Sequence, residues 1–367
     1  MSSTTDAFNR FRGLEPAVTA VVVNYNGGER VLAALKAVTG QSCPPASVVL
    51  VDNGSADGSA DAVARRFPDI TVLQLGANRG PAAARNKGLE LATSDLVLLL
   101  DADIYLQDDC LARLRATYEA ERPSVVCPRI LLHPEDLVHC DGAAMHFIGN
   151  MALRNGYQPL SAVRTEARAL VQACGSACLL VDRRCVLAAG GFDTLYFFYF
   201  EDLEFSFRLS ASGHRILYEP SAVVRHDRRR GTPGLSYRGV GTYPPQRVYL
   251  TLRNRLLTIG IHFQRRTLLV LAPALALYET AALITCLARG WGKQWLRAWA
   301  WQVKNAPAIR ERRRRNQRTR VLSDQELIVG GPLPFAPGFA RSRLEKAAVK
   351  ALSAVLDAYW RLARGLL

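Results

Sequence analysis

The chain has 367 residues, enough for one large domain with an additional region or for two domains, which excludes an isolated small module. Hydrophobic residues make up 49% of the sequence and charged residues 22%, so the chain can build a sizeable core and is not generally disordered. The formal net charge is +15, and the excess lies entirely in the last third. Residues 1–245 carry 25 basic and 26 acidic side chains, whereas residues 246–367 carry 22 and 6. This asymmetry predicts a C-terminal segment that meets a polyanion, either anionic lipid or nucleic acid.

Four successive strand-and-helix units occupy the first third of the chain. Each begins with a β-branched or leucine-rich run and continues into a segment with helical spacing. The expected strands are Ala17–Val23, Ser47–Val51, Ile70–Leu75 and Asp95–Leu100, and the expected helices are Glu29–Thr39, Gly58–Phe67 and two that begin at Pro81 and near Asp108. Alternation of this kind predicts an α/β fold with a doubly wound, mostly parallel sheet.

The middle of the chain is less regular, and its end is helical. We expect short strands at Val125–Pro128, Ala177–Val181 and Arg215–Tyr218 and a helix that opens at Glu201. After Tyr249 the pattern becomes helical. The predicted organisation is a polar leader over residues 1–16, an α/β domain over residues 17–245 and a basic, apolar helical region over residues 246–367.

Polar side chains follow the predicted strands at their carboxyl ends. Asn24, Asp52, Asn78, Asp101 and Asp103 all lie at these ends or just beyond them. In doubly wound sheets the loops leaving the carboxyl ends line the ligand crevice. One cleft is therefore expected to collect several carboxylates and amides.

The pair of carboxylates in Asp101-Ala102-Asp103 suits a hard divalent cation. Magnesium uses one or two protein carboxylates together with substrate phosphates, so a metal-bound diphosphate is the natural ligand. The alternative is that these aspartates only cap the turn into the next helix.

Two further loops suggest nucleotide binding. Asp52 ends a buried strand and could accept a hydrogen bond from a uracil or thymine ring, although an Asx turn would explain it equally well. The segment from Asn78 combines a glycine loop, a helix N-terminus and the cations Arg79, Arg85 and Lys87, which together favour an anion. It lacks the G-x-x-x-x-G-K-[ST] motif of NTPases and the G-x-G-x-x-G motif of dinucleotide-binding proteins. The sequence therefore does not favour ATP hydrolysis or hydride transfer.

Aromatic and acidic side chains lie together in the second half. The run Tyr196–Phe200, which includes Tyr199, precedes Glu201 and Asp202, so an acceptor could rest on the rings beside a general base. The alternative is a helix whose first turn carries acids because of its dipole. His226 follows a short apolar strand and could bind a metal or a phosphate, although a lone histidine often does neither.

Seven motifs occur in order along the chain. They are Val21-Val22-Val23-Asn24-Tyr25-Asn26, Val51-Asp52-Asn53-Gly54-Ser55, Asn78-Arg79-Gly80 through Asn86-Lys87-Gly88, Asp101-Ala102-Asp103, Gly191-Phe192-Asp193, Glu201-Asp202 and Tyr249-Leu250-Thr251-Leu252-Arg253-Asn254. Taken together, these motifs resemble the family-2 inverting glycosyltransferases of GT-A fold, and among them the bacterial rhamnosyltransferase-like members. The resemblance runs from about Val18 to Arg255, and it rests on the set of motifs rather than on any one of them.

The resemblance implies a role for each matching residue. Asp52 would contact the base of a nucleotide diphosphate sugar, Asp101 the ribose, and Asp103 a divalent cation, Mg²⁺ or Mn²⁺, that bridges the phosphates. Asp202 would remove the proton of the acceptor hydroxyl, and His226 would be a further metal or diphosphate ligand. The remaining candidates are Asn24, Asn78, Arg79 and Arg85 for donor binding, and Glu201 and Tyr199 for acceptor binding.

The expected activity is therefore metal-assisted, inverting transfer of a sugar, in a rhamnosyltransferase-like hexosyltransferase. The donor would be a dTDP-, UDP- or GDP-linked sugar, and the acceptor a hydroxyl of a lipid-linked saccharide or polysaccharide, as in assembly of the cell envelope. Two alternatives stay open at this point: a sugar nucleotidyltransferase, and a catalytically inactive, membrane-attached scaffold.

The apolar stretch Thr267–Ala288 is long enough to cross a bilayer of about 30 Å. Cations flank both of its ends and Glu279 lies within it, so we expect it to lie in one leaflet with nearby tryptophans at the headgroups. The alternative is a buried helix that packs on the catalytic body or on a second copy in a homo-oligomer.

The N-terminus lacks the apolar core of a secretory signal, so we expect a peripheral or monotopic protein on the cytoplasmic face of the inner membrane. Its basic segment would meet an anionic membrane surface. No motif for nucleic acid accompanies the arginines, and no nucleic-acid partner is expected.

Overall fold

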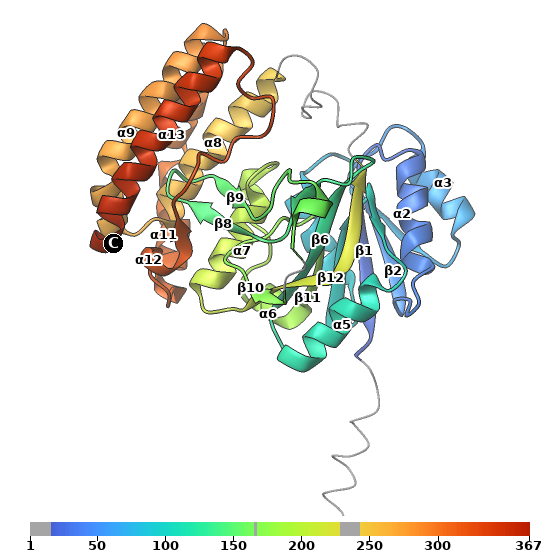
Figure 1. The fold of residues 1–367 in the computed structure, drawn as a ribbon. Helices are drawn as coiled ribbons and strands as arrows, with labels where there is room; N and C mark the ends of the chain where they lie inside the picture. The colour runs from blue at the N-terminus through green and yellow to red at the C-terminus, as the bar shows by residue number, and fades with distance from the viewer. Residues whose placement is uncertain (1–15, 165–166, 228–242) are drawn as a thin grey trace, which may run out of the picture.

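A ten-stranded sheet forms the centre of the computed structural model, which describes residues 16–164, 167–227 and 243–367 (Figure 1). The strands are β1 (Val18–Asn24), β2 (Ser47–Asp52), β3 (Thr71–Gln74), β4 (Leu96–Asp101), β5 (Ile104–Leu106), β6 (Val125–His133), β7 (Val138–Cys140), β10 (Ala169–Leu170), β11 (Cys178–Asp182) and β12 (Ile216–Asp227). Their order is β10-β12-β6-β11-β4-β1-β2-β3, with β5 paired to β12 and β7 to β6. Residues 1–15 of the predicted leader lie outside the described residues.

The sheet is mostly parallel, as the alternating pattern predicts. Strands β3, β2, β1 and β4 run parallel, and β12 is parallel to β6, while β11 lies antiparallel between β4 and β6. The predictions for β6 and β12 are too short. The two strands continue to pair beyond Pro128 and Pro220. The register shifts between Glu219 and Val223 of β12, and this irregularity lets the pairing pass the two prolines.

Helices cover both faces of the sheet. The helices of this part are α2 (Glu29–Thr39), α3 (Ser59–Arg66), α4 (Pro81–Leu91), α5 (Cys110–Glu121), α6 (Arg183–Ala188) and α7 (Glu201–Ala211). Alternate residues of β1 point to opposite sides of the sheet. Ala20 lies in one apolar cluster with residues of α2 and α5, whereas Val21 lies in a second cluster with residues of α4 and α7.

The C-terminal third is helical, and it is joined to the body by a shared sheet. The helix bounds are α8 (Pro245–His262), α9 (Arg265–Ala288), α10 (Gly292–Lys304), α11 (Ala306–Thr319), α12 (Asp324–Leu327) and α13 (Arg343–Ala363). Strand β13 (Ile328–Val329) pairs with β8 (Ala143–His146), which pairs with β9 (Met151–Leu153). Trp360 stacks on Phe147 at 5.1 Å between ring centroids. The helices α9 and α13 lie side by side away from the central sheet (Figure 1). The division at residue 245 stays a prediction.

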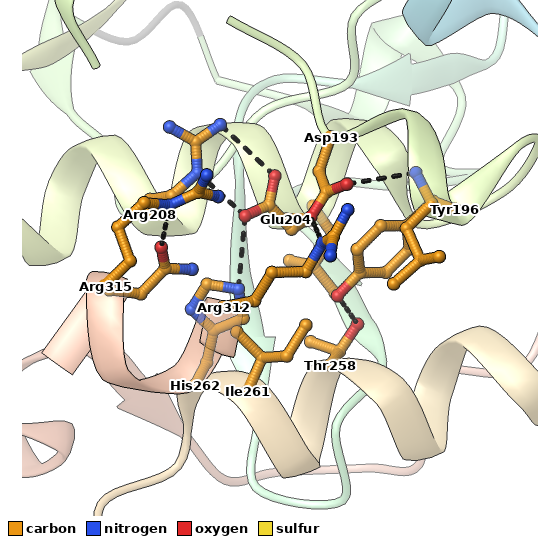
Figure 2. Close-up of polar contacts among 12 residues, drawn as sticks. Asp193, Tyr196, Glu204, Arg208, Thr258, Ile261, His262, Arg312 and Arg315 are labelled. Atoms are coloured by element: carbon orange, nitrogen blue, oxygen red, sulfur yellow. Dashed lines mark hydrogen bonds and ion pairs between the residues drawn. The ribbon is translucent and has the colours of Figure 1, made fainter. Parts of the chain in front are cut away.

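Buried charges fix α7 against the C-terminal helices (Figure 2). The Glu204 carboxylate accepts a hydrogen bond from Arg208 at 2.8 Å and lies 3.4 Å from Nε2 of His262, at the end of α8. Burial by itself would raise the pKa of Glu204, but Arg208 and His262 lower it to about 2. Asp193, before α7, accepts a hydrogen bond from Arg312 of α11 at 2.7 Å. The C-terminal helices therefore hold α7 in place.

Replacing Glu204 with Gln should lower the free energy of unfolding by about 3–5 kcal/mol, because it leaves the buried Arg208 without its counter-charge. Urea denaturation measures this loss. The difference from the parent should shrink as the pH falls from 4.5 toward about 2, where Glu204 of the parent also loses its charge. Glu90→Gln, which removes the exposed pair with Lys87, is the control and should cost at most about 1 kcal/mol. Equal losses in both variants would contradict the structural role of Glu204.

Candidate active site

The carboxyl ends of three parallel strands bring the predicted polar residues to one edge of the sheet. Asn24 at the end of β1 is in register with Asp52 at the end of β2, and Val23 is in register with Asp101 at the end of β4. Asp103 follows two residues later, just before β5. The strand register therefore gathers the side chains that the sequence placed at strand ends.

Asn24 and Asp52 form a buried polar cluster at this edge. The Asn24 amide donates to Asp52 at 2.8 Å, and Asp52 accepts from the Ser55 backbone N–H at 3.0 Å and from its hydroxyl at 2.5 Å. This is the Asx-turn arrangement, and neither Asn24 nor Asp52 is among the residues that line the cavity described below, whereas Asn53 is. Contact of Asp52 with a nucleotide base stays a prediction.

The loop before α4 is held by amide side chains. Asn53 donates to the Asn78 side chain at 3.0 Å and accepts from the Arg79 backbone N–H at 2.9 Å. Gly80 has a φ of 82°, and a Cβ there would lie 2.2 Å from the Phe197 carbonyl oxygen, so only glycine allows this close approach. Asn78 lines the cavity at the N-terminus of α4, and the Arg79 side chain is not among its lining residues.

Arg85 of α4 is a buried cation between two carboxylates. It donates to Asp101 at 2.6 Å and to Glu201 at 3.4 Å, and its side chain is only 2% exposed. Glu201 is the first residue of α7, 116 positions along the chain from Arg85. One guanidinium thus ties the carboxyl end of β4 to the start of α7, and Arg85 is a positioning residue at this site.

Burial raises the pKa values of the two acids that open α7. For Glu201 the neighbouring Asp202 carboxylate adds to this increase, and Arg85 opposes it. For Asp202 the Leu203 backbone N–H, which donates to the carboxylate at 2.8 Å, and the charge of Arg85 oppose the effect of burial. A raised pKa makes the ionised Asp202 carboxylate a stronger proton acceptor, as a general base requires. The pKa of Glu201 is raised to about 8, so this group is mostly protonated near neutral pH.

The aromatic loop before α7 has a strained backbone that α8 supports. Tyr199 and Phe200 are non-glycine residues with φ values of 65° and 69°. The Asn254 amide of α8 donates to the carbonyls of Phe198 and Tyr199 at 2.9 and 2.6 Å, and Arg253 donates to the Tyr196 carbonyl at 2.5 Å. The downstream Arg253-Asn254 pair therefore fixes the loop that presents Tyr199 and Asp202.

Asp103 and His226 form the candidate metal pair. Nε2 of His226 lies 3.5 Å from Oδ1 of Asp103, and both side chains line the cavity. Nδ1 of His226 lies 3.2 Å from Nδ1 of His139, which leaves Nε2 on the side of Asp103. No group of three or more candidate ligand side chains occurs among residues 16–164, 167–227 and 243–367. The pair fits a cation that takes its other ligands from phosphate and water.

A cavity of about 640 Å³ joins these parts, which is a typical volume for a small-molecule site. It is lined by strand-end residues and by residues of α7, so the two halves of the chain contribute to one site. The predicted site residues that line it are Asn78, Arg85, Asp101, Asp103, Tyr199, Glu201, Asp202 and His226.

Arg30, His139 and Asn53 are among the polar lining residues that were not expected from the sequence. Arg30 on α2 has a guanidinium nitrogen 3.7 Å from Asp103, and His139 contacts His226. Asn53 lines the cavity directly, where its neighbour Asp52 was predicted to do so. The motif around Asp52 could have indicated Asn53, but no local pattern identifies Arg30 or His139, because tertiary contacts place them.

The comparisons with known proteins agree with this site. Residues 19–172 match the family model for glycosyl transferase family 2. The N-acetylglucosaminyl-diphospho-decaprenol L-rhamnosyltransferase of Mycobacterium tuberculosis is 31% identical over 238 residues, which cover 58% of this chain and 76% of that protein. The pre-mycofactocin glycosyltransferase of the same organism is 33% identical over 186 residues, which cover 50% of this chain and 37% of that protein. The chain belongs to glycosyltransferase family 2.

Solved structures show the same fold. The mannosyltransferase PcManGT of Pyrobaculum calidifontis aligns with a TM-score of 0.51 at 20% identity, over 95% of this chain and 88% of its own. Residues 1–349 of S. aureus TarS align with a TM-score of 0.53 at 16% identity, over 94% and 92%. The GT-A fold is confirmed. Membership of glycosyltransferase family 2 makes the protein a glycosyltransferase rather than the sugar nucleotidyltransferase that the sequence left open.

Replacing Arg85 with Gln should lower the free energy of unfolding by about 3–5 kcal/mol near neutral pH, because the pair between the buried guanidinium and Asp101 is broken. Without Arg85 the pKa of Glu201 rises further above its unfolded value, so stability is retained at low pH and lost as the pH rises. Urea denaturation between about pH 5 and about pH 9 measures this trend.

Two further variants test the cause of that loss. Adding Glu201→Gln to Arg85→Gln should recover part of the stability, since Gln is neutral in both the folded and the unfolded state, whereas Glu201 must take up a proton on folding. The control Arg113→Gln removes an exposed pair with Asp109 and should cost at most about 1 kcal/mol. A loss in Arg85→Gln that does not vary with pH would contradict the pairing.

Proposed function

We propose that this protein is an inverting, metal-dependent glycosyltransferase that moves a sugar from a nucleotide diphosphate sugar to a hydroxyl of a lipid-linked saccharide or polysaccharide. The observation that carries the proposal is the shared cavity, which Asp103 and His226 line together with Asp202. A donor diphosphate and an acceptor hydroxyl could therefore meet between them.

The donor half of the site would be the carboxyl edge of the sheet. Asn53, Asn78 and Asp101 would contact the nucleoside, and Asp103 and His226 would hold a divalent cation, Mg²⁺ or Mn²⁺. Such a cation neutralises the charge that builds on the leaving diphosphate. PcManGT was solved with GDP-Man and Mn²⁺ and TarS with UDP-GlcNAc, which supports a nucleotide sugar donor and leaves the nucleotide open.

The acceptor half would be the start of α7. Asp202 would take the proton of the acceptor hydroxyl, while Tyr199 and Glu201 would position the acceptor sugar. With the base and the leaving diphosphate on opposite sides of the sugar, displacement is in line and inverts the anomeric carbon without a covalent enzyme intermediate. The name of the mycobacterial rhamnosyltransferase specifies a saccharide on a diphospho-decaprenol, which supports a lipid-linked acceptor.

The outer faces of the C-terminal helices support attachment to a membrane. Helix α9 is the one helix among the described residues that is long and apolar enough to cross a bilayer, by length and composition. Its Glu279 pairs with Arg255 of α8, so the acid points into the protein. The large side chains exposed on α9 are Leu269, Leu277, Ile284 and Leu287. A soluble helix would carry polar residues there, and we infer that α9 lies in one leaflet.

Helices α10 and α13 extend this surface. Leu296 and Val303 of α10 are 64% and 76% exposed, and Leu344 and Leu362 of α13 are 80% and 83% exposed. Lysines and arginines flank them, including Lys293, which would suit anionic headgroups. The location that we propose is the cytoplasmic face of the membrane, where anionic lipids attract such cations.

Part of the basic run serves the protein itself rather than lipid. Arg312 pairs with Asp193, and Arg320 pairs with Asp324. Arg313 donates to the backbone carbonyls of Gly260 and Phe263. Only the remaining cations of the C-terminal region are therefore candidates for contact with headgroups.

Asp202→Asn tests the base assignment. Asn has the shape of Asp but cannot accept the proton, so kcat should fall by about 10²- to 10⁴-fold, while binding of the nucleotide sugar is unchanged. In the parent, kcat/KM should fall at low pH with an apparent pKa above 3.8, the usual value for aspartate, because burial raises the pKa of Asp202. The exposed Asp136→Asn is the control and should leave turnover unchanged. Full activity of Asp202→Asn would refute the assignment.

A variant of the outer face tests membrane attachment. Leu277→Glu combined with Ile284→Glu should weaken flotation with anionic vesicles by about tenfold or more, because two charges replace the apolar stripe of α9. Val321→Glu is the control, since Val321 is 69% exposed but lies outside these helices. Point variants are required because α11 helps to anchor α7, so deleting it would disturb the catalytic body. Unchanged flotation of the double variant would remove α9 from the membrane surface.

A further inference from the structure

The cavity that Asp202 lines is also lined by Arg255, Tyr278 and a group of apolar side chains from the C-terminal region. We name the part of the cavity next to this group the apolar arm. The group consists of Leu153 of β9, Ala282 and Cys286 of α9, Phe335 of the segment before α13, and Val349 and Leu352 of α13. We propose that the apolar arm binds the hydrocarbon chain of a phosphate-linked lipid acceptor, next to its phosphate. This inference rests on the proposed function, because it places the rest of the same acceptor.

The lining of the arm selects hydrocarbon rather than sugar. Its side chains are aliphatic, aromatic or a thiol, and burial raises the pKa of Cys286, so this thiol stays neutral. The Thr285 hydroxyl, which also lines the cavity, donates to the Ala281 carbonyl of its own helix at 2.8 Å. A sugar in the arm would lose its hydrogen bonds to water without replacement, whereas a hydrocarbon chain would gain from burial.

A buried cation, Arg255, lines the same cavity as the apolar arm. Arg255 is 3% exposed and packs 4.5 Å from the centroid of the Tyr278 ring, while it pairs with Glu279 and donates to the Ile148 carbonyl at 2.6 Å. Its Nε is buried and has no hydrogen-bond partner among the residues that the structure describes. Because Glu279 already balances the charge of Arg255, the feature that suits a phosphate between the lipid and the sugar is this free N–H donor.

The walls of the arm are the inner faces of the helices proposed to contact the membrane. Ala282 and Leu352 line the arm, whereas Ile284 on α9 and Val355 on α13 point outward and are 62% and 57% exposed. Helices α9 and α13 pack side by side (Figure 1). A lipid chain that leaves the arm between them would therefore enter the bilayer without crossing water.

Photo-crosslinking of the full chain with a benzophenone-bearing farnesyl diphosphate tests the proposal without any need for sugar transfer. The crosslinked peptides should come from residues 281–286 and 349–352, and unlabelled farnesyl phosphate should compete. Ala282→Trp fills the arm and should reduce the crosslinking yield by about tenfold, which corresponds to roughly 1.4 kcal/mol of binding. Ala276→Trp, on the exposed side of the same helix, is the matched control and should leave the yield unchanged.

Val349→Trp blocks the arm from the opposite helix and should repeat the loss if Ala282→Trp fails to fold. Crosslinks spread over the outer face of α9, or a yield that neither blocking variant changes, would overturn the proposal. A failure of the proposed function gives a different result, because a protein with no glycosyl transfer would still show crosslinks in the arm. Conversely, loss of the crosslinks with normal transfer to a water-soluble acceptor would reject the arm alone.

Discussion

The arrangement of the site depends on one buried guanidinium. Arg85 pairs with Asp101 at the carboxyl end of β4 and with Glu201 at the start of α7, so it joins the donor edge of the sheet to the helix that carries Asp202. The Asp101 carboxylate offsets the cost of burying Arg85, and Arg85 in turn opposes the increase that burial causes in the pKa of Glu201.

The C-terminal helices support the same site through contacts with the aromatic loop and with α7. Asn254 and Arg253 of α8 hold the carbonyls of the aromatic loop, and His262 lies against Glu204 on α7. The same region presents an apolar outer surface on α9, α10 and α13. The proposed attachment to a membrane and the orientation of the base helix are therefore linked, since one set of helices provides both.

Much of the donor edge could be predicted from the sequence, because strand ends and turns are encoded locally. The first four strands, the helix from Pro81 and the positions of Asp101 and Asp103 follow from hydrophobic periodicity and turn residues. The pairing of Arg85 with Glu201, and the contact of His139 with His226, join segments far apart in the chain and leave no local pattern. The extended pairing of β6 with β12 was missed for the same reason.

The most direct test of the account is a crystal structure of the protein with Mn²⁺ and a nucleoside diphosphate, with the metal located by its anomalous scattering. The account predicts a metal peak bound by Asp103, with His226 beside it, and a diphosphate that faces Asp202 across the cavity. A metal bound elsewhere, or a nucleotide outside the cavity that Asp202 lines, would contradict it.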